Sequence, residues 1–301
     1  MLETFQVKAY DGLNLQLYRY GNEGPILHFY HANSFCASLY EPILRELATE
    51  YTVIATDVRG HGRSERPVKI DSWYEIAADL ESVLTKLNVK SVIAIGHSLG
   101  AVTTILAAVS KPELFQQIIA LDPVFFLPYH LWILAMMRAF KMEKKFLPVK
   151  VALRRQSQFP NIETLFKSYR KKAVFQRWSD EMLWNYCQSC FKSADNGQYE
   201  LACPPHIEAD IYASIPLKTW RELKQLKTPT TIVRGEYSDA LSNKAVQQAL
   251  RSSAYVKALQ MREAGHLFPM EKPELTAELI KCIIKGENPM QLLIDKFAAI
   301  P

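Results

Sequence analysis

Hydrophobic positions follow two alternating patterns along this chain, short apolar runs and longer segments with helical spacing. Residues 5–10 and 13–20 alternate apolar with polar residues on either side of Asp11-Gly12, which predicts a β-hairpin. The runs after this hairpin are denser, and dense apolar runs are typical of strands buried on both faces. They cover residues 26–30, 51–56, 92–95, 117–121, 230–235 and 254–259.

Helical spacing of apolar residues separates several of these runs. The pattern predicts helices over 40–49, 72–87, 242–251 and 273–285. Strands that alternate with helices form a parallel sheet with helices on both faces. We therefore expect an α/β protein with a doubly wound, mostly parallel sheet.

The alternation stops between residues 125 and 205. Nearly half of the aromatic residues lie in this stretch, and its Lys and Arg outnumber its Asp and Glu about twofold. The positive net charge of the chain therefore belongs to this segment, which we interpret as an insertion into the α/β domain. At the other end, residues 286–301 have the pattern of a short amphipathic tail.

Composition narrows the class of protein. The chain has 301 residues, of which 49% are hydrophobic and 22% charged, values typical of a soluble globular protein. The first residues show neither the basic start nor the apolar stretch of a secretory signal, so we expect a cytoplasmic protein. Five irregularly spaced cysteines do not form a disulfide pattern. Cys187 and Cys190 have no second pair at zinc-site spacing, so we interpret them as small apolar groups.

The clearest chemical signal is the pentapeptide 96–100, Gly-His-Ser-Leu-Gly. It joins the apolar run 92–95 to a helical pattern beginning at Ala101, and a serine at such a strand-to-helix turn presents its hydroxyl as a nucleophile. We therefore take Ser98 as the candidate nucleophile. The alternative is that Ser98 only caps the helix.

A serine nucleophile needs a histidine base and a carboxylate that orients it. His266 follows the last predicted strand, and Asp239 follows the strand before it. Catalytic groups in parallel sheets gather at the carboxyl ends of strands, so these residues can meet Ser98. Asp122, at the end of the run 117–121, is the alternative acid, or else a turn residue before Pro123.

The motifs together resemble those of the α/β-hydrolase superfamily, in particular its lid-bearing branch. They are the segments 57–64, 96–100, 235–239 and 265–266, in that order. The resemblance covers nearly the whole chain and implies an eight-stranded, mostly parallel sheet with a helical cap inserted after the sixth strand. It assigns residues 1–124 and 206–301 to the core and 125–205 to the cap. Some lid-bearing relatives take their acid from the sixth strand, which keeps Asp122 as the alternative.

The resemblance also places an oxyanion hole. By position, the main-chain N–H groups of Asn33 and Leu99 would stabilise the oxyanion. Ala32 stands where the family usually has glycine, which restricts the backbone of this loop. Four further histidines are expected to have structural roles. Hydrogen bonds from three of them would brace loops, namely His31, His61 and His97. The fourth, His28, is expected to be a hydrogen-bonded core residue. Glu208, where the chain leaves the cap, is a weaker candidate for substrate contact.

These residues predict a serine hydrolase that cleaves a carboxylic ester without a metal or organic cofactor. Carbon–carbon bonds, thioesters, amides and lactones remain alternatives because the same triad serves them, as does a scaffold that only binds a small molecule. Some cap aromatics could line an apolar acyl or aryl pocket: Phe125, Phe126, Tyr129, Trp132, Phe166, Tyr169, Phe175, Trp178, Trp184 and Tyr186.

The basic residues of the cap are interpreted first as a solvated face. A weaker alternative is that they steer anionic substrates or contact an anionic membrane. No motif supports nucleic-acid binding, and the sequence leaves the oligomeric state open.

Overall fold

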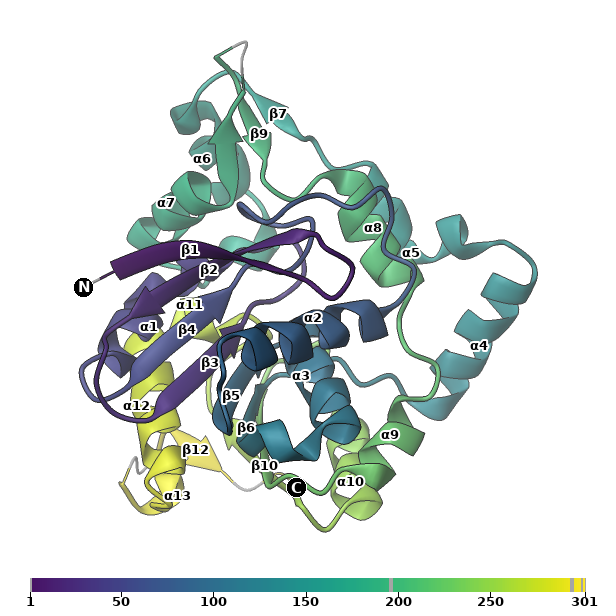
Figure 1. The fold of residues 1–301 in the computed structure, drawn as a ribbon. Coiled ribbons are helices and arrows are strands. Elements are labelled where there is room, and N and C mark those ends of the chain that lie inside the picture. Colours follow the sequence, from purple (N-terminus) through teal and green to yellow (C-terminus); the bar gives the residue numbers. More distant parts are fainter. Residues whose placement is uncertain (1, 195–196, 293–294, 299, 301) are drawn as a thin grey trace.

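The protein is built around one large twisted sheet (Figure 1). The computed structural model describes residues 2–194, 197–292, 295–298 and 300. In spatial order the strands are β1 (Leu2–Lys8), β2 (Asn14–Tyr20), β4 (Thr52–Thr56), β3 (Ile26–Tyr30), β5 (Val92–His97), β6 (Phe115–Leu121), β10 (Thr230–Gly235), β11 (Val256–Met261) and β12 (Phe297–Ala298).

The eight predicted strands are confirmed, and the ninth, β12, is a two-residue addition at the edge. Strands β4, β3, β5, β6, β10 and β11 pair in parallel, whereas β1, β2 and β12 join the sheet antiparallel. The carboxyl ends of the parallel strands therefore meet at one edge. β12 lies in the predicted tail 286–301, part of which is outside the described residues.

Helices cover both faces of the sheet, as the alternating pattern predicted. One face packs against α1 (Glu41–Leu47) and α12 (Pro273–Ile284), and the other against α2 (Trp73–Lys86), α3 (Leu99–Ser110), α9 (Thr219–Gln225) and α10 (Asn243–Ser252). The remaining helices of this part are α8 (Pro205–Ala213), α11 (Phe268–Glu271), α13 (Pro289–Leu292), η1 (Ala37–Tyr40) and η2 (Pro112–Leu114).

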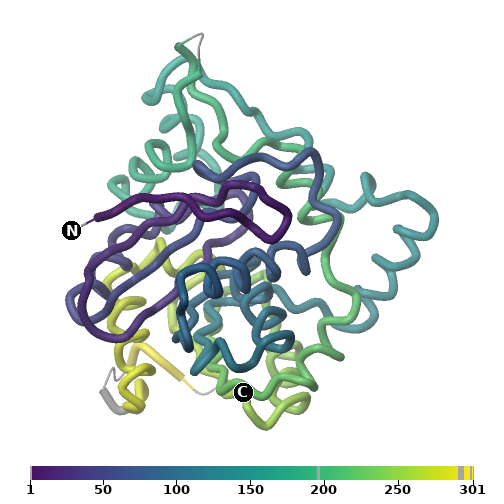
Figure 2. The backbone as a smooth tube through the Cα atoms, viewed as in Figure 1, coloured from purple at the N-terminus to yellow at the C-terminus, as the bar shows by residue number. Residues whose placement is uncertain are grey.

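The insertion leaves the sheet after β6 and returns before β10, as the path of the backbone shows (Figure 2). Its helices are α4 (Pro128–Ala139), η3 (Glu143–Lys145), α5 (Leu147–Leu153), α6 (Ile162–Arg170), η4 (Ala173–Phe175) and α7 (Asp180–Ser189). Besides these helices the insertion contains three short strands that the sequence did not predict: β7 (Gln158–Phe159), β9 (Tyr199–Leu201) and β8 (Phe191–Ser193) form a small antiparallel sheet. The domain boundaries at 125 and 205 stay a prediction.

Candidate active site

Ser98 occupies the sharp turn between β5 and α3. Its backbone has φ 55° and ψ −113°, a conformation that non-glycine residues rarely adopt. The flanking glycines permit this turn, since a Cβ on Gly96 would collide with the backbone of Gly100, and one on Gly100 would collide with the carbonyl of Tyr30. The local sequence thus forces the strand, the helix and the loop after β3 together around Ser98.

Three side chains from distant parts of the chain form a hydrogen-bonded row at this turn. His266 Nε2 lies 3.1 Å from Ser98 Oγ, and His266 Nδ1 lies 2.7 Å from Asp122 Oδ2. Asp122 is fully buried and its carboxylate accepts, so Nδ1 carries the proton and Nε2 is left to accept from the serine hydroxyl. The arrangement is that of a nucleophile, its base and an orienting acid.

The predicted pairing of Asp239 with His266 was wrong. Asp239 is exposed in the loop after β10, and this loop turns its donors, not that carboxylate, toward the site. The N–H of Gly235 donates to Asp122 Oδ1 at 2.8 Å, and the hydroxyl of Ser238 donates to Asp122 Oδ2. Asp122 takes the position because β6 lies between β5 and β10 in the sheet. The alternative that the sequence left open, Asp122 at the end of the run 117–121, is therefore the residue that pairs with His266.

The two predicted oxyanion-hole amides lie on adjacent segments. Leu99 follows the nucleophile, and Asn33 belongs to the loop after β3 that runs against Gly100. Among the described residues, neither backbone N–H has an acceptor. Both donors therefore remain available to a substrate oxygen.

Two buried histidines hold the loop that carries Asn33. His31 Nε2 accepts from the N–H of Val58 at 2.8 Å, and His61 Nε2 accepts from the N–H of Ser34 at 3.0 Å. Burial lowers the pKa of both imidazoles, and that of His61 falls to about 4. Neutral rings with these fixed tautomers are braces, as the sequence predicted.

His97 links the sharp turn at Ser98, which we call the elbow, to the segment that carries His266. Its Nδ1 lies 2.6 Å from the hydroxyl of Tyr40, and its Nε2 donates to the carbonyl of His266 at 3.0 Å. Burial lowers the pKa of His97, and the nearby His266 lowers it further. Tyr40 also accepts from the N–H of Ala32 at 3.3 Å. Tyr40, which the sequence did not single out, thus joins the loop after β3, which carries Asn33, to the elbow.

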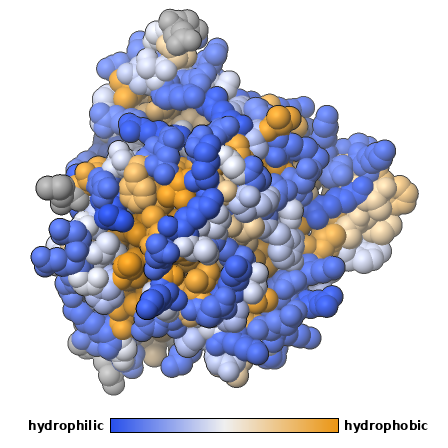
Figure 3. Space-filling model, viewed as in Figure 1, coloured by the Kyte–Doolittle hydropathy of each residue, from blue (hydrophilic) through white to orange (hydrophobic). Residues whose placement is uncertain are grey.

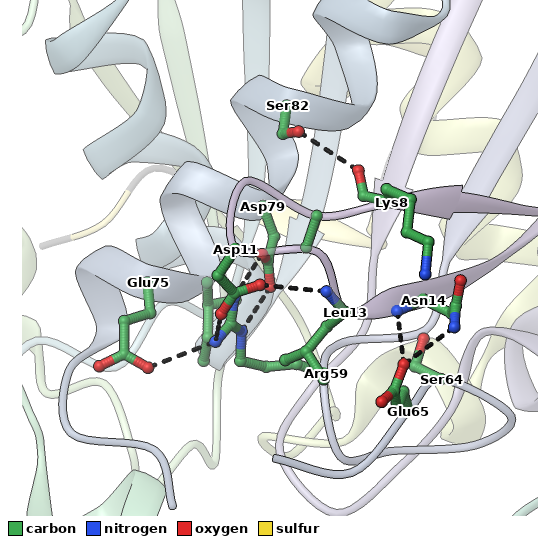
Figure 4. Close-up of polar contacts among 12 residues, drawn as sticks. Lys8, Asp11, Leu13, Asn14, Arg59, Ser64, Glu65, Glu75, Asp79 and Ser82 are labelled. Atoms are coloured by element: carbon green, nitrogen blue, oxygen red, sulfur yellow. Dashed lines mark hydrogen bonds and ion pairs between the residues drawn. The ribbon is translucent and has the colours of Figure 1, made fainter.

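The loop 57–64 is fixed by buried charges. Asp57 accepts from the N–H groups of Ala37 and Arg63, at 2.7 and 2.9 Å. Arg59 is 2% exposed and makes a bidentate pair with Asp79, with Nε to Oδ2 at 2.7 Å and Nη2 to Oδ1 at 2.6 Å (Figure 4). This charged anchor fixes the loop from which His61 braces the candidate oxyanion hole.

The insertion contacts the loop after β3 through Arg155, a partly buried arginine. Arg155, just after α5, donates to Glu208 Oε2 at 2.7 Å and to the hydroxyl of Ser34. Its other nitrogens donate to the hydroxyls of Tyr169, at 3.1 Å, and Tyr186. Arg155 therefore links Glu208 of α8 to Ser34, the residue next to Asn33. Glu208 is the counter-ion of this arginine.

The aromatic residues predicted to line a pocket mostly have other surroundings. Tyr169, Phe175, Trp178 and Tyr186 are buried and pack on one another, with ring centroids 4.9 to 5.9 Å apart. The others are distributed over the insertion: Phe166 and Trp184 line a groove with Glu41 and Arg45, Phe125 packs on Trp220, Phe126 on Phe146, and Tyr129 and Trp132 are exposed.

The described part of the chain contains neither a disulfide nor a cluster of residues suited to bind a metal ion. All five thiols are free and buried, and Cys190 Sγ lies 3.3 Å from Cys36 Sγ. No cluster of three or more His, Cys, Asp or Glu within the described ranges has the arrangement of a metal site.

His28 lies in β3 with Nε2 2.9 Å from Thr56 Oγ1, which confirms it as a core histidine. No helix among the described residues combines the length and apolarity needed to cross a bilayer.

Comparison with known proteins gives relatives for most of the chain. A 2-(acetamidomethylene)succinate hydrolase of Mesorhizobium japonicum is 34% identical over 106 residues, which are 35% of this chain and only 37% of that relative. The uncharacterized hydrolase YugF of Bacillus subtilis is 24% identical over 91% of this chain and 96% of its own.

Solved structures share the fold. The crystal structure of E-2-(acetamidomethylene)succinate hydrolase has a TM-score of 0.78 at 23% identity and covers 95% of this chain and all of its own. A thioesterase domain from the curacin biosynthetic pathway has a TM-score of 0.72 at 20% identity, over 93% and 99% of the two chains. The model of the alpha/beta hydrolase family matches residues 27–279. With its predicted fold confirmed, the chain belongs to the alpha/beta hydrolase family.

Proposed function

We propose that the protein is a serine hydrolase that cleaves a carboxylic ester through an acyl-enzyme. The observation that carries this proposal is the row Ser98 Oγ, His266 Nε2, His266 Nδ1 and Asp122 Oδ2, with separations of 3.1 and 2.7 Å. A serine hydroxyl is unreactive at neutral pH until a base removes its proton. The row supplies that base together with a buried acceptor that fixes its tautomer.

In the proposed reaction, Ser98 Oγ attacks the ester carbonyl while its proton passes to His266 Nε2. The charge that forms on the imidazole is stabilised by the carboxylate of Asp122. The oxyanion lies between the N–H groups of Asn33 and Leu99, and loss of one such donor typically costs about 3 kcal/mol of transition-state stabilisation. His266 then protonates the leaving alcohol, and water activated by the same nitrogen releases the acid.

The substrate we propose is a small ester with an apolar or aromatic acyl group. Support comes from the contact of the insertion with Ser34, next to Asn33, and from the similarity to a putative esterase/lipase of Haemophilus influenzae. None of these steps uses a metal or organic cofactor. Thioester, lactone, amide and carbon–carbon bond hydrolysis remain alternatives because the same triad serves each of them.

Two measurements test the proposal. A fluorophosphonate probe should label the folded wild type, and Ser98→Ala should abolish labelling. Labelling that persists in Ser98→Ala, or a folded wild type that resists the probe, contradicts the assignment and favours a scaffold that only binds. A panel of p-nitrophenyl esters graded by acyl length, run beside thioester and lactone substrates, then identifies the bond. Turnover of thioesters or lactones without turnover of esters would refute the ester assignment alone.

A further inference from the structure

Helix α4 turns a stripe of large apolar side chains toward solvent. The stripe comprises residues spaced i, i+3, i+4, i+7 and i+11, namely Tyr129, Trp132, Ile133, Met136 and Phe140 just beyond the helix. Trp132 is 66% exposed and Phe140 67% exposed. Exposed apolar residues are ordinary when scattered, but a continuous stripe of this size marks an interaction surface.

The opposite side of α4 fixes this orientation. Leu131 and Leu134 are buried in the core beneath the helix. Arg138 donates from Nε to the carbonyl of Ala213 at 2.8 Å and from Nη2 to that of Ile215 at 2.7 Å. The helix is therefore held with its second apolar face outward, where it covers no other described part of the protein.

Helix α5 extends the same surface. Leu147 is 69% exposed and Val151 60% exposed, whereas Val149 and Ala152 on the inner side pack against α8. Figure 1 shows α4 projecting from the body of the molecule, and Figure 3 shows hydrophobic surface along this projection between hydrophilic patches. We call the exposed side chains of residues 129–154 the α4–α5 face.

Positive charge surrounds this apolar surface. Exposed lysines and one arginine are interspersed with it, at Lys141, Lys144, Lys145, Lys150 and Arg154. The ion pairs of the described residues include none of these five. Glu143 is the one acidic residue in this stretch of sequence. The α4–α5 face thus combines unpaired cations with aromatic and aliphatic side chains.

We propose that the α4–α5 face docks on a lipid bilayer that contains anionic phospholipid. Apolar side chains of such a face enter the boundary between headgroups and acyl chains, where Trp and Tyr are favoured. Each Lys or Arg near an anionic leaflet adds to the attraction. A second copy of this chain fits less well, because a two-fold interface would bring the five cations of each copy together. The proposal is independent of the reaction at Ser98.

Vesicle co-sedimentation tests the proposal. We expect the full chain to sediment with vesicles of phosphatidylcholine and phosphatidylglycerol, to stay in solution with phosphatidylcholine alone, and to be released by about 0.5 M NaCl. The double variant W132S/F140S should lower the partition coefficient at least about tenfold, because it removes two interfacial aromatic side chains. K144E/K145E should lower it by a similar factor by removing two cations and adding two anions.

The matched control is Y255S, which removes an exposed aromatic residue from the segment before β11 and should leave the partition coefficient unchanged. All substituted side chains are exposed, so circular dichroism should show folded variants. Any of three results would overturn the proposal: the wild type does not bind anionic vesicles, W132S/F140S binds as well as the wild type, or binding does not depend on lipid charge and salt.

Sedimentation velocity without lipid tests the alternative occupant. A dimer that W132S/F140S converts to monomer would assign the face to a second copy instead.

Discussion

His266 Nδ1 lies 2.7 Å from Asp122 Oδ2, although the two residues are 144 positions apart in the sequence. The sheet order explains this meeting, since β6 is hydrogen-bonded to β5 on one side and to β10 on the other. Asp122 therefore stands beside Ser98, and its carboxylate accepts from Gly235 at the end of β10 and from Ser238 in the loop that follows. The site is assembled around a buried acid from the sixth strand of the sequence.

We expect Asp122→Asn to lower kcat about 10⁴-fold, because an amide at this position no longer fixes the tautomer of His266. Asp239→Asn should stay within about twofold of wild type, since it changes an exposed side chain. Steady-state hydrolysis of a p-nitrophenyl ester by the two purified variants measures both values. Ester turnover that survives in Asp122→Asn and collapses in Asp239→Asn would return the role of the acid to Asp239.

Sequence patterns predicted the sheet, its helices, Ser98 and His266, because each depends on local periodicity or on a short motif. The choice between Asp122 and Asp239 depends on which strand is the neighbour of β5 and on how a loop closes, and neither is encoded in spacing. Asp122 also adopts φ 43°, a backbone conformation that is uncommon for residues other than glycine, although Asp adopts it more often than most.

Contacts of the insertion were harder still to predict. Arg155 belongs to a run of basic residues that has the pattern of a solvated face. Its guanidinium nevertheless donates hydrogen bonds to Glu208, Tyr169 and Tyr186. Likewise, the small sheet of β7, β9 and β8 consists of strands of two or three residues, which are too short to show periodicity.

Arg155→Met should lower both the free energy of unfolding and kcat. The substitution leaves the carboxylate of Glu208 buried without its cation, which typically costs about 3–5 kcal/mol. Ser34, next to Asn33, loses its tie to the insertion at the same time. Urea unfolding and ester kinetics measure the two effects.

The double variant R155M/E208M separates these effects. It removes the unpaired charge, so we expect it to recover most of the lost stability while kcat remains low. A double variant that recovers stability and kcat together would show that Arg155 acts on folding alone. Unchanged kcat in Arg155→Met would contradict the link to the loop after β3 directly.

Asp79→Ala should be among the most destabilising single substitutions in the core. Arg59 is 2% exposed and would keep only Asp11, at 3.0 Å, and Glu75, at 3.5 Å, as partners. Breaking a buried pair in this way typically costs about 3–5 kcal/mol. The apolar pair R59M/D79L should be more stable than Asp79→Ala in urea unfolding, because it leaves no buried arginine without its bidentate partner. Equal loss in the two variants would show that packing, and not the unpaired charge, dominates.

Acid should destabilise the fold through its buried histidines. Burial lowers the pKa of His28 from 6.5 to about 3, so the native state stays neutral while the unfolded chain takes up a proton. The unfolded state binds more protons between these two values, and stability is therefore complete above pH 6.5 and falls as the pH drops toward 3. His28→Gln should flatten the plot of free energy of unfolding against pH by up to about 1.4 kcal/mol per pH unit below pH 6. Urea unfolding at pH 8 gives the cost of the substitution itself, and parallel plots for variant and wild type between pH 5 and 6 would contradict the prediction.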